Sequence, residues 1–398
     1  MIRVLIADDS AFMRMVLSDM FKKQRDFEVV GMAMNGKEAV EKTKALHPDL
    51  LTMDVNMPVM DGLEALSIIM KDIPTPVIMF SSLTKEGADA TIRALSLGAV
   101  DFVSKVGGSI SKVDTVEAEI LAKARAAASA VHVLKGAAAF TSPTPIAQPP
   151  AHSVPTTTPA AQPAPSPAGP PTMRRISLPT RKGYTPPPAP AAGIPRPHAV
   201  PSPRAVSGGS AGRKIVVLGC STGGPKALQT VVAGLPKNLP CGVLIVQHMP
   251  PGFTKSLADR LNEISQISVK EAENHDMIKA GCVYIAPGNY HMTVGAGGRE
   301  ILLNQDPPLG TLRPAADVLF KSAAPFGKDI VSVILTGMGS DGAVGMTEIK
   351  KTGGYIIAES EKTAVVYGMP KAVVELGIAD EIKPLPEIAA AIVSAVNH

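Results

Sequence analysis

The segment from residue 50 to residue 62 reads LLTMDVNMPVMDG, and it decides the fold of the first half of the chain. Its opening run, Leu50–Val55, is mostly apolar, as expected for a strand buried on both faces of a sheet. Pro58 then marks a turn, after which Gly62–Met70 has the spacing of an amphipathic helix. A buried strand that leads into a helix is the repeating unit of a parallel sheet with helices on both faces.

The same alternation continues on both sides of this segment. Further strands are predicted at 3–7, 27–34, 77–80 and 100–103, and further helices at 12–20, 36–46 and 85–97. Five strands that alternate with helices predict an α/β domain over residues 1–125, built on a five-stranded parallel, flavodoxin-like sheet.

A proline-rich segment separates this domain from the rest of the chain. Residues 141–204 hold 20 of the 37 prolines, and residues 126–212 hold seven basic side chains and no acidic one. Such a segment buries too little apolar surface to offset its ordering entropy, so we expect a flexible basic linker over 126–212. The net charge of +4 therefore belongs to the linker and says little about what either domain recognises.

From residue 214 the alternation of strands and helices resumes. Strands are predicted at 214–218, 242–247 and 330–335, and helices at 225–235 and 254–264. We expect a second α/β domain over residues 213–398, with a doubly wound, Rossmann-like parallel sheet.

Composition favours a cytoplasmic protein. The three cysteines, Cys220, Cys241 and Cys282, are too few and too scattered for a disulfide framework or a zinc site. The N-terminus lacks the pattern of a signal peptide, and no apolar run approaches the ~18 residues that span a bilayer. We expect a chain that is not inserted in a membrane.

Polar side chains follow the predicted strands of the first domain at the points where the strands end. They are Asp8, Asp9, Asp54, Ser81 and Lys105. Because the carboxyl ends of parallel strands meet at one edge of a sheet, we expect these groups to lie together. Clustered carboxylates suit Mg²⁺, and a metal with a lysine offsets the charge of a phosphoryl group in transfer to Asp54.

This constellation, with the Met-Pro-x-x-Asp-Gly turn after Asp54, resembles the receiver domain of two-component response regulators over about residues 1–122. The resemblance implies phosphorylation of Asp54 by a partner histidine kinase. It also implies that Asn56 offers its backbone carbonyl to Mg²⁺, beside Asp8, Asp9 and Asp54. Ser81 stands where many receivers carry Thr, and both residues offer a hydroxyl.

The second domain carries a serine on a glycine-rich turn. Residues 219–224 read GCSTGG, directly after a predicted strand and before a predicted helix, which is the layout of a nucleophile elbow around Ser221. The glycines permit a sharp turn, and the helix N-terminus offers unpaired N–H groups to an oxyanion. The same pattern also occurs in plain helix caps and in phosphate-binding loops.

A serine nucleophile needs a base and an orienting acid. His248 ends the predicted strand 242–247, and Asp341 follows the strand 330–335, so three strand ends converge in a Ser221–His248–Asp341 triad. His275 and His291 remain lesser candidates for the base. The chain order Ser…His…Asp differs from that of the α/β-hydrolases, which places the triad on a different sheet.

Residues 213–398 carry four motifs, namely GCSTGG at 219–224, QHMP at 247–250, APGNYHM at 286–292 and TGMGSDG at 336–342. Together they resemble the catalytic domain of the CheB family of chemotaxis methylesterases. The resemblance implies hydrolysis of glutamate γ-methyl esters on chemoreceptors and deamidation of receptor glutamines to glutamate. It also implies the triad above, oxyanion support from Thr222 and the Met338 backbone N–H, regulation by phosphorylation, and no cofactor in the catalytic domain.

Three alternatives stay open. Cys220 lies beside Ser221 and is a rival nucleophile, although its place at a strand end favours a packed, inert thiol. The second domain could instead bind a nucleotide without chemistry, but GCSTGG lacks the spacing of a dinucleotide site and the ending of a P-loop. A DNA-binding output fits poorly, since residues 213–398 have as many acidic as basic side chains, and we expect no nucleic-acid partner.

Overall fold

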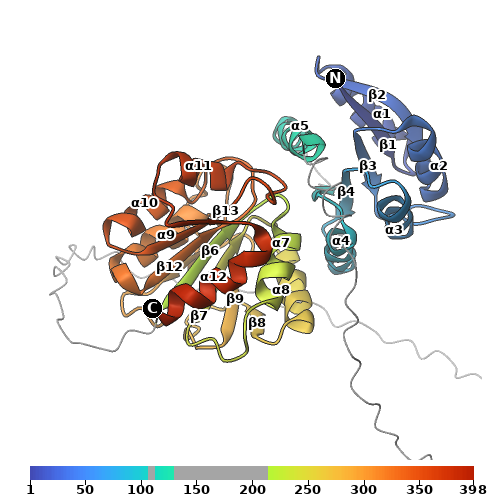
Figure 1. The fold of residues 1–398 in the computed structure, drawn as a ribbon. Helices are drawn as coiled ribbons and strands as arrows, with labels where there is room; N and C mark the ends of the chain where they lie inside the picture. The colour runs from blue at the N-terminus through green and yellow to red at the C-terminus, as the bar shows by residue number, and fades with distance from the viewer. Residues whose placement is uncertain (106–112, 130–213) are drawn as a thin grey trace, which may run out of the picture. The chain divides into compact units, whose positions relative to one another are not determined.

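The computed structural model describes residues 1–105, 113–129 and 214–398, which form an N-terminal and a C-terminal α/β domain (Figure 1). Each domain is described by itself. The predicted linker over 126–212 lies outside the described residues, except for its first four positions, 126–129.

The N-terminal domain is a five-stranded parallel sheet in the order β2-β1-β3-β4-β5. Its strands are β1 (Ile2–Ala7), β2 (Phe27–Ala33), β3 (Leu50–Asp54), β4 (Val77–Ser82) and β5 (Asp101–Lys105). Its helices are α1 (Ala11–Lys22), α2 (Gly36–Leu46), α3 (Gly62–Asp72), α4 (Lys85–Leu97) and α5 (Val113–Ser129). This strand order is the predicted flavodoxin-like arrangement.

Local sequence explains the starts of the helices. Four of them begin directly after a residue whose side chain accepts a hydrogen bond from the first turn, namely Ser10, Asn35, Asp61 and Thr84. Helix α5 continues through Ser129, past the predicted domain end at residue 125, because Ala126 and Ala127 are buried.

The C-terminal domain is a seven-stranded parallel sheet in the order β14-β13-β12-β6-β7-β9-β8. Its strands are β6 (Ile215–Cys220), β7 (Gly242–Gln247), β8 (Ser268–Glu271), β9 (Cys282–Ile285), β12 (Ile330–Ile334), β13 (Tyr355–Glu359) and β14 (Glu381–Lys383). From β6 the chain moves to β7 on one side, and later to β12 on the other side. The carboxyl ends of β6 and β12 therefore flank a switch point of the sheet. Ligands bind at such points in doubly wound sheets.

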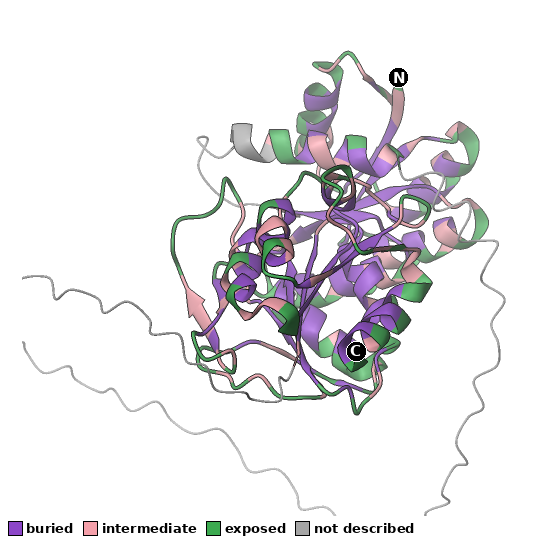
Figure 2. Cartoon of the chain, turned by 60° about the vertical axis from the view of Figure 1, so that its left-hand side comes forward, coloured by how far each residue is buried: buried purple, intermediate pink, exposed green. Residues whose placement is uncertain are grey.

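Helices and one small sheet complete this domain. The helices are α7 (Gly224–Ala233), α8 (Phe253–Ile264), α9 (Ala316–Ala323), η2 (Ala324–Asp329), α10 (Ala343–Lys351), α11 (Met369–Glu375) and α12 (Leu385–Asn397). Strands β10 (His291–Val294) and β11 (Ile301–Asn304) form a separate antiparallel pair. Figure 2 shows the central strands buried in both domains, with exposed residues on the outer faces of the helices and in loops.

The predicted α/β fold class is confirmed for both domains. Strands β8 to β11, β13 and β14 were not predicted from the sequence. Most of these strands have only three or four residues, and several of their side chains are partly exposed, so they lack a long apolar run. No helix of the described residues is both long enough and apolar enough to cross a bilayer.

Candidate functional sites

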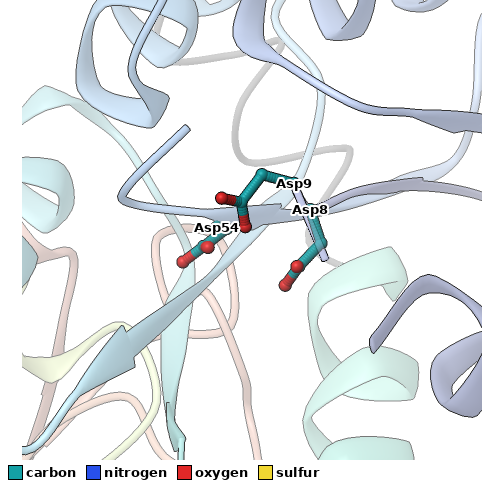
Figure 3. Close-up of side chains that lie close together, drawn as sticks. All are labelled: Asp8, Asp9 and Asp54. Atoms are coloured by element: carbon teal, nitrogen blue, oxygen red, sulfur yellow. The ribbon is translucent and has the colours of Figure 1, made fainter. Parts of the chain in front are cut away.

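The predicted carboxylates of the N-terminal domain lie together. Asp8 and Asp9 follow β1, Asp54 ends β3, and one oxygen from each lies within 4.8 Å of the others (Figure 3). Asp8 and Asp54 are buried, whereas Asp9 is exposed. The edge between β1 and β3 therefore concentrates negative charge at the carboxyl ends of the strands.

Lys105 is the cation of this cluster. Its Nζ lies 2.7 Å from Asp54 Oδ2 and 2.9 Å from Asp8 Oδ2. Burial acts to lower the pKa of Lys105, but hydrogen bonds to the two carboxylates outweigh it and raise that pKa. Burial also raises the pKa of Asp54 despite the opposing effect of Lys105, and the charge of Asp8 adds to the rise.

The donor set fits Mg²⁺. The site offers carboxylate oxygens, the ligands that this ion prefers. Lys105 contacts two of the three carboxylates, so the cluster keeps an excess of negative charge that a divalent cation would offset.

Ser81 and Asn56 flank the cluster differently. Ser81 is buried in β4, and its hydroxyl donates a 2.9 Å hydrogen bond to the carbonyl of Gly87 in α4. In this arrangement the hydroxyl is directed to the helix backbone. Asn56 is exposed in the loop after β3.

The turn after Asp54 is sterically demanding at one position. A Cβ atom on Gly62 would lie 2.1 Å from the carbonyl oxygen of Asp54, so only glycine fits here. The preceding Asp61 caps α3 by accepting a 2.8 Å hydrogen bond from the Glu64 N–H. The Asp-Gly pair thus brings the start of α3 against the end of β3.

In the C-terminal domain, Ser221 follows β6 on the turn that leads into α7. Its N–H donates to the carbonyl of Thr336, at 3.0 Å, which ties the turn to the loop after β12. Gly223 has a φ of +79°, a conformation that strongly favours glycine. The sharp strand-to-helix turn predicted from GCSTGG is present.

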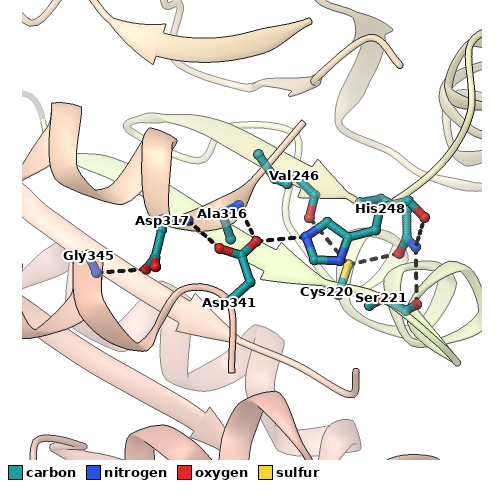
Figure 4. Close-up of polar contacts among 9 residues, drawn as sticks. Cys220, Ser221, Val246, His248, Ala316, Asp317, Asp341 and Gly345 are labelled. Carbon is teal, nitrogen blue, oxygen red and sulfur yellow. Dashed lines mark hydrogen bonds and ion pairs between the residues drawn. The ribbon is translucent and has the colours of Figure 1, made fainter. Parts of the chain in front are cut away.

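His248 and Asp341 meet beside this turn. His248 follows β7, Asp341 lies in the loop between β12 and α10, and His248 Nε2 is 2.7 Å from Asp341 Oδ2 (Figure 4). In Figure 4 the second ring nitrogen lies on the side of Cys220 and Ser221. The structure therefore brings the three predicted triad residues to one edge of the sheet.

The environment of Asp341 defines the tautomer of His248. Burial acts to raise the pKa of Asp341, but hydrogen bonds from His248 and from the N–H groups of Asp317 and Ala316 outweigh it and lower that pKa. An ionised carboxylate only accepts hydrogen bonds, so Nε2 of neutral His248 carries the proton. Nδ1 is then the basic nitrogen.

Two backbone N–H groups near Ser221 are available to a ligand. Within the described residues, neither the N–H of Thr222 nor that of Met338 donates a hydrogen bond to a protein acceptor. The two segments approach closely, since a Cβ atom on Gly337 would lie 2.9 Å from Ser221 Cβ. The Gly337–Met338 segment therefore lies next to the serine.

The thiol of Cys220 is buried and occupied. It donates to Gln247 Oε1 at 3.1 Å, and no part of the residue is exposed. Burial raises the pKa of this thiol well above its usual range, and the charge of Glu359 adds to the rise. A buried neutral thiol is a poor nucleophile.

The two other histidines of the domain lie in different contacts. His275 is exposed, and its Nδ1 is 2.6 Å from Glu300 Oε1. His291 is buried at the start of β10, with its Nε2 3.3 Å from the carbonyl of Pro307. Among the described residues, neither ring makes a hydrogen bond with Ser221 or Asp341.

Known proteins match this architecture along the whole chain. The family model described as CheB methylesterase matches residues 216–392, and that of the response regulator receiver domain matches residues 4–113. A protein-glutamate methylesterase/protein-glutamine glutaminase of Symbiobacterium thermophilum is 46% identical over 399 residues, which cover 100% of this chain and 98% of the relative.

The chain belongs to the protein-glutamate methylesterase/protein-glutamine glutaminase family. A relative of that name from Thermotoga maritima is 43% identical over 391 residues, which cover 97% of this chain and 96% of the relative. These matches confirm the predicted family, the predicted hydrolase class and the predicted control by a receiver domain.

Two solved structures from Thermotoga maritima are similar to the two halves of the chain. The CheB methylesterase catalytic domain is 46% identical, covers 46% of this chain and 97% of its own, and has a TM-score of 0.45. The response regulator domain of CheB is 57% identical, covers 32% of this chain and 96% of its own, and has a TM-score of 0.30.

The sequence reading missed several side chains that support the site of this methylesterase-family domain. Gln247 Nε2 donates to the carbonyls of Ser221, at 3.1 Å, and His248, at 3.2 Å, so it links the two predicted catalytic segments. The hydroxyl of Thr336 donates to the carbonyl of Thr222 at 2.9 Å. Gln247 precedes His248 in the QHMP motif at 247–250, and this position is the sequence feature that could have indicated its role.

Glu359, at the end of β13, is a buried carboxylate behind this site. Its Oε2 accepts the N–H of Thr336 at 2.8 Å, and its Oε1 accepts the hydroxyl of Thr363 at 3.0 Å. Burial raises its pKa from 4.5 to about 7, against the effect of these two hydrogen bonds. The folded protein therefore binds the proton of the Glu359 carboxyl group more tightly than the unfolded chain does.

The sign of the pH dependence follows from this rise. The contribution of Glu359 to stability is fully present below about pH 4.5 and is lost as the pH rises through about 7. We expect Glu359→Gln, which keeps an acceptor for Thr336, to raise the free energy of unfolding by about 3 kcal/mol at about pH 8. Near pH 4.5 the expected effect is close to zero.

Urea unfolding of the full-length protein at the two pH values measures this effect. The exposed neighbour Glu361 supplies the control, because Glu361→Gln should change stability little at either pH. An effect of Glu359→Gln that is equal at both pH values would show that the carboxylate does not titrate as described.

Proposed function

We propose that residues 214–398 hydrolyse glutamate γ-methyl esters and glutamine carboxamides of a protein substrate, with Ser221 as the nucleophile. The observation that carries this proposal is the 2.7 Å contact between His248 Nε2 and Asp341 Oδ2 beside the Ser221 turn. The contact leaves Nδ1 of His248 as the base for the Ser221 hydroxyl.

The reaction proceeds through an acyl-enzyme. Ser221 Oγ attacks the ester carbonyl carbon while its proton moves to His248 Nδ1. The bond to the methoxy group breaks as this proton is returned to the departing methanol. Water then attacks the acyl group, again through His248, and releases the glutamate carboxylate and Ser221. A glutamine carboxamide follows the same steps with ammonia as the leaving group.

The N–H groups of Thr222 and Met338 stabilise the oxyanion. Neither N–H group donates to a protein acceptor among the described residues, and the backbone at Gly337, next to Met338, lies close to Ser221. Donors that are fixed before the reaction lower the barrier to the tetrahedral intermediate. The catalytic domain needs no cofactor for these steps.

The buried state of Cys220 supports Ser221 over its neighbour as the nucleophile. The thiol is fully buried, its proton is directed to Gln247, and its pKa is raised. Ser221 is half-buried and stands on the turn itself.

The N-terminal domain accepts a phosphoryl group on Asp54. An oxygen of Asp54 forms the new bond to phosphorus as the bond to the donor breaks. Lys105 is in contact with that carboxylate, and Ser81 has a hydroxyl that can turn from Gly87 to the phosphoryl oxygens. Asp8, Asp9, Asp54 and the carbonyl of Asn56 would hold Mg²⁺, which offsets the charge of the group in transfer.

The substrate and the phosphodonor are proteins of a chemotaxis pathway. Methylated chemoreceptors are the substrate, and a chemotaxis histidine kinase is the donor. The reaction takes place in the cytoplasm, in keeping with the three free cysteines of the catalytic domain. No nucleic-acid partner is needed for either step.

Methanol release from methylated receptor membranes tests this function. Wild-type protein should release methanol, and acetyl phosphate with Mg²⁺ should raise the rate. If chemoreceptors of its own pathway release no methanol under any of these conditions, the proposed substrate is wrong. Methanol release that does not respond to acetyl phosphate and Mg²⁺ would support the esterase activity but contradict its proposed control by phosphorylation.

A further inference from the structure

Two helices of the catalytic domain cap each other at their N-termini. The N-cap residues of α9 and α10 are Ala315 and Gly342, and neither has a side-chain hydrogen bond to its own helix. The unpaired N–H groups at the start of each helix are instead satisfied by an aspartate that belongs to the other helix or its approach.

The first of these caps is Asp341, which precedes α10. Its Oδ2 accepts the N–H of Ala316 at 2.6 Å, and its Oδ1 accepts the N–H of Asp317 at 3.0 Å (Figure 4). Both donors belong to the first turn of α9. The carboxylate that meets His248 is therefore oriented by the start of this helix.

The second cap is Asp317, a residue of α9 that caps the start of α10. Asp317 Oδ1 accepts the N–H of Gly345, in the first turn of α10, at 2.7 Å. The helices approach closely here, because a Cβ atom on Gly345 would lie 2.5 Å from Phe320 Cβ and 3.0 Å from the Asp317 carbonyl oxygen. Asp317 is buried, so water does not replace this hydrogen bond.

The charges fit the same arrangement. Burial raises the pKa of Asp317, the N–H of Gly345 acts to lower it, and the charge of Asp341 adds to the rise. Two carboxylates are tolerated close together because each faces the positive end of a helix.

We propose that Asp317 is a positioning residue for the esterase site, which holds α9 against α10 so that Asp341 Oδ2 meets His248 Nε2. It does not touch the reacting atoms, and it acts through Asp341. This role rests on the proposed function, in which Asp341 orients the base.

Three substitutions of Asp317 separate the effect of the position of its carboxylate from the effect of its charge. Asp317→Asn keeps an acceptor of the same length for Gly345, so kcat for methanol release from methylated receptor membranes should stay within about threefold of wild type. Asp317→Ala removes the acceptor, and Asp317→Glu displaces it. Both should lower kcat by about 10- to 100-fold with KM nearly unchanged, because a misplaced catalytic group slows chemistry more than binding.

Asp380 supplies the matched control. Its Oδ2 accepts the N–H of Ile356 at 2.9 Å at the start of β13, and its Oδ1 contacts Lys350 in the last turn of α10. Asp380→Ala therefore also removes a carboxylate-to-backbone hydrogen bond, but no contact with Asp341 or with the first turn of α10. This variant should keep the wild-type kcat at temperatures at which thermal melting shows it to be folded.

A second readout does not depend on the esterase reaction. In full-length protein with labelled histidine, the His248 Nε2 proton that is shared with Asp341 should give a low-field NMR resonance. We expect this resonance in wild type, Asp317→Asn and Asp380→Ala, and its loss in Asp317→Ala, Asp317→Glu and Asp341→Ala.

The outcomes distinguish the two proposals. Absence of methanol release from wild type would reject the proposed function, while the resonance would still decide the role of Asp317. Survival of both kcat and the resonance in Asp317→Ala would overturn the positioning role. If that variant does not fold, a kcat of Asp317→Glu equal to or above that of Asp317→Asn would overturn it.

Discussion

Ser221→Ala is expected to lower the rate of methanol release by a factor on the order of 10⁴ to 10⁶, because members of a triad act as one unit. The variant keeps the N–H that donates to Thr336, and alanine fits where serine stands. We therefore expect a folded protein whose KM for methylated receptors is little changed. Initial rates of methanol release with receptor membranes measure the effect.

Cys220→Ala is the matched control for this experiment. It removes the neighbouring side chain and its hydrogen bond to Gln247, but it leaves the proposed nucleophile in place. We expect this variant to keep substantial activity at a cost in stability, since it opens a small buried space. Activity that survives in Ser221→Ala and disappears in Cys220→Ala would make Cys220 the nucleophile.

Asp54→Asn is expected to abolish both the incorporation of a phosphoryl group and the response of the esterase to acetyl phosphate. The amide cannot form the acyl phosphate, and it also removes the charge that contacts Lys105 at 2.7 Å. Incubation with labelled phosphodonor and Mg²⁺, followed by a count of protein-bound phosphate, measures the first effect. Methanol release with and without the donor measures the second.

Asp61→Asn provides a comparison on the same loop. Asparagine also caps helices well, so the hydrogen bond from the Glu64 N–H should persist. Phosphoryl incorporation should then resemble that of wild type. Protein-bound phosphate on the Asp54→Asn variant, at the level of wild type, would place the acceptor elsewhere.

The strands that carry the two sites could be predicted from the sequence, because their burial leaves a clear apolar run. All five residues of β3 and all six of β6 and β7 are buried, and each run ends at or just before a polar residue of a site. Once parallel strands are inferred, Asp54, Ser221, His248 and Asp341 must lie at the carboxyl edges of their sheets. Pattern and topology together therefore predict which side chains meet.

The supporting residues could not be predicted in the same way. Asp317 lies in the first turn of α9, a helix that the sequence did not predict, and its partner Gly345 lies on another helix. Glu359 ends β13, a strand that the sequence did not predict, and its contact with Thr336 depends on the pairing of β13 with β12. The ring orientation of His248 likewise depends on the position of Asp341, which only three-dimensional packing defines.

The cap that Asp341 places on α9 has a consequence for the evolution and engineering of this enzyme. Active-site carboxylates often strain the fold, so that their replacement gains stability and loses activity. Asp341 instead satisfies two backbone N–H groups as well as His248, so its removal should cost both properties together. Selection for a robust fold and selection for turnover therefore act in the same direction at this position, whereas the replacement of Glu359 by glutamine should affect stability through its raised pKa.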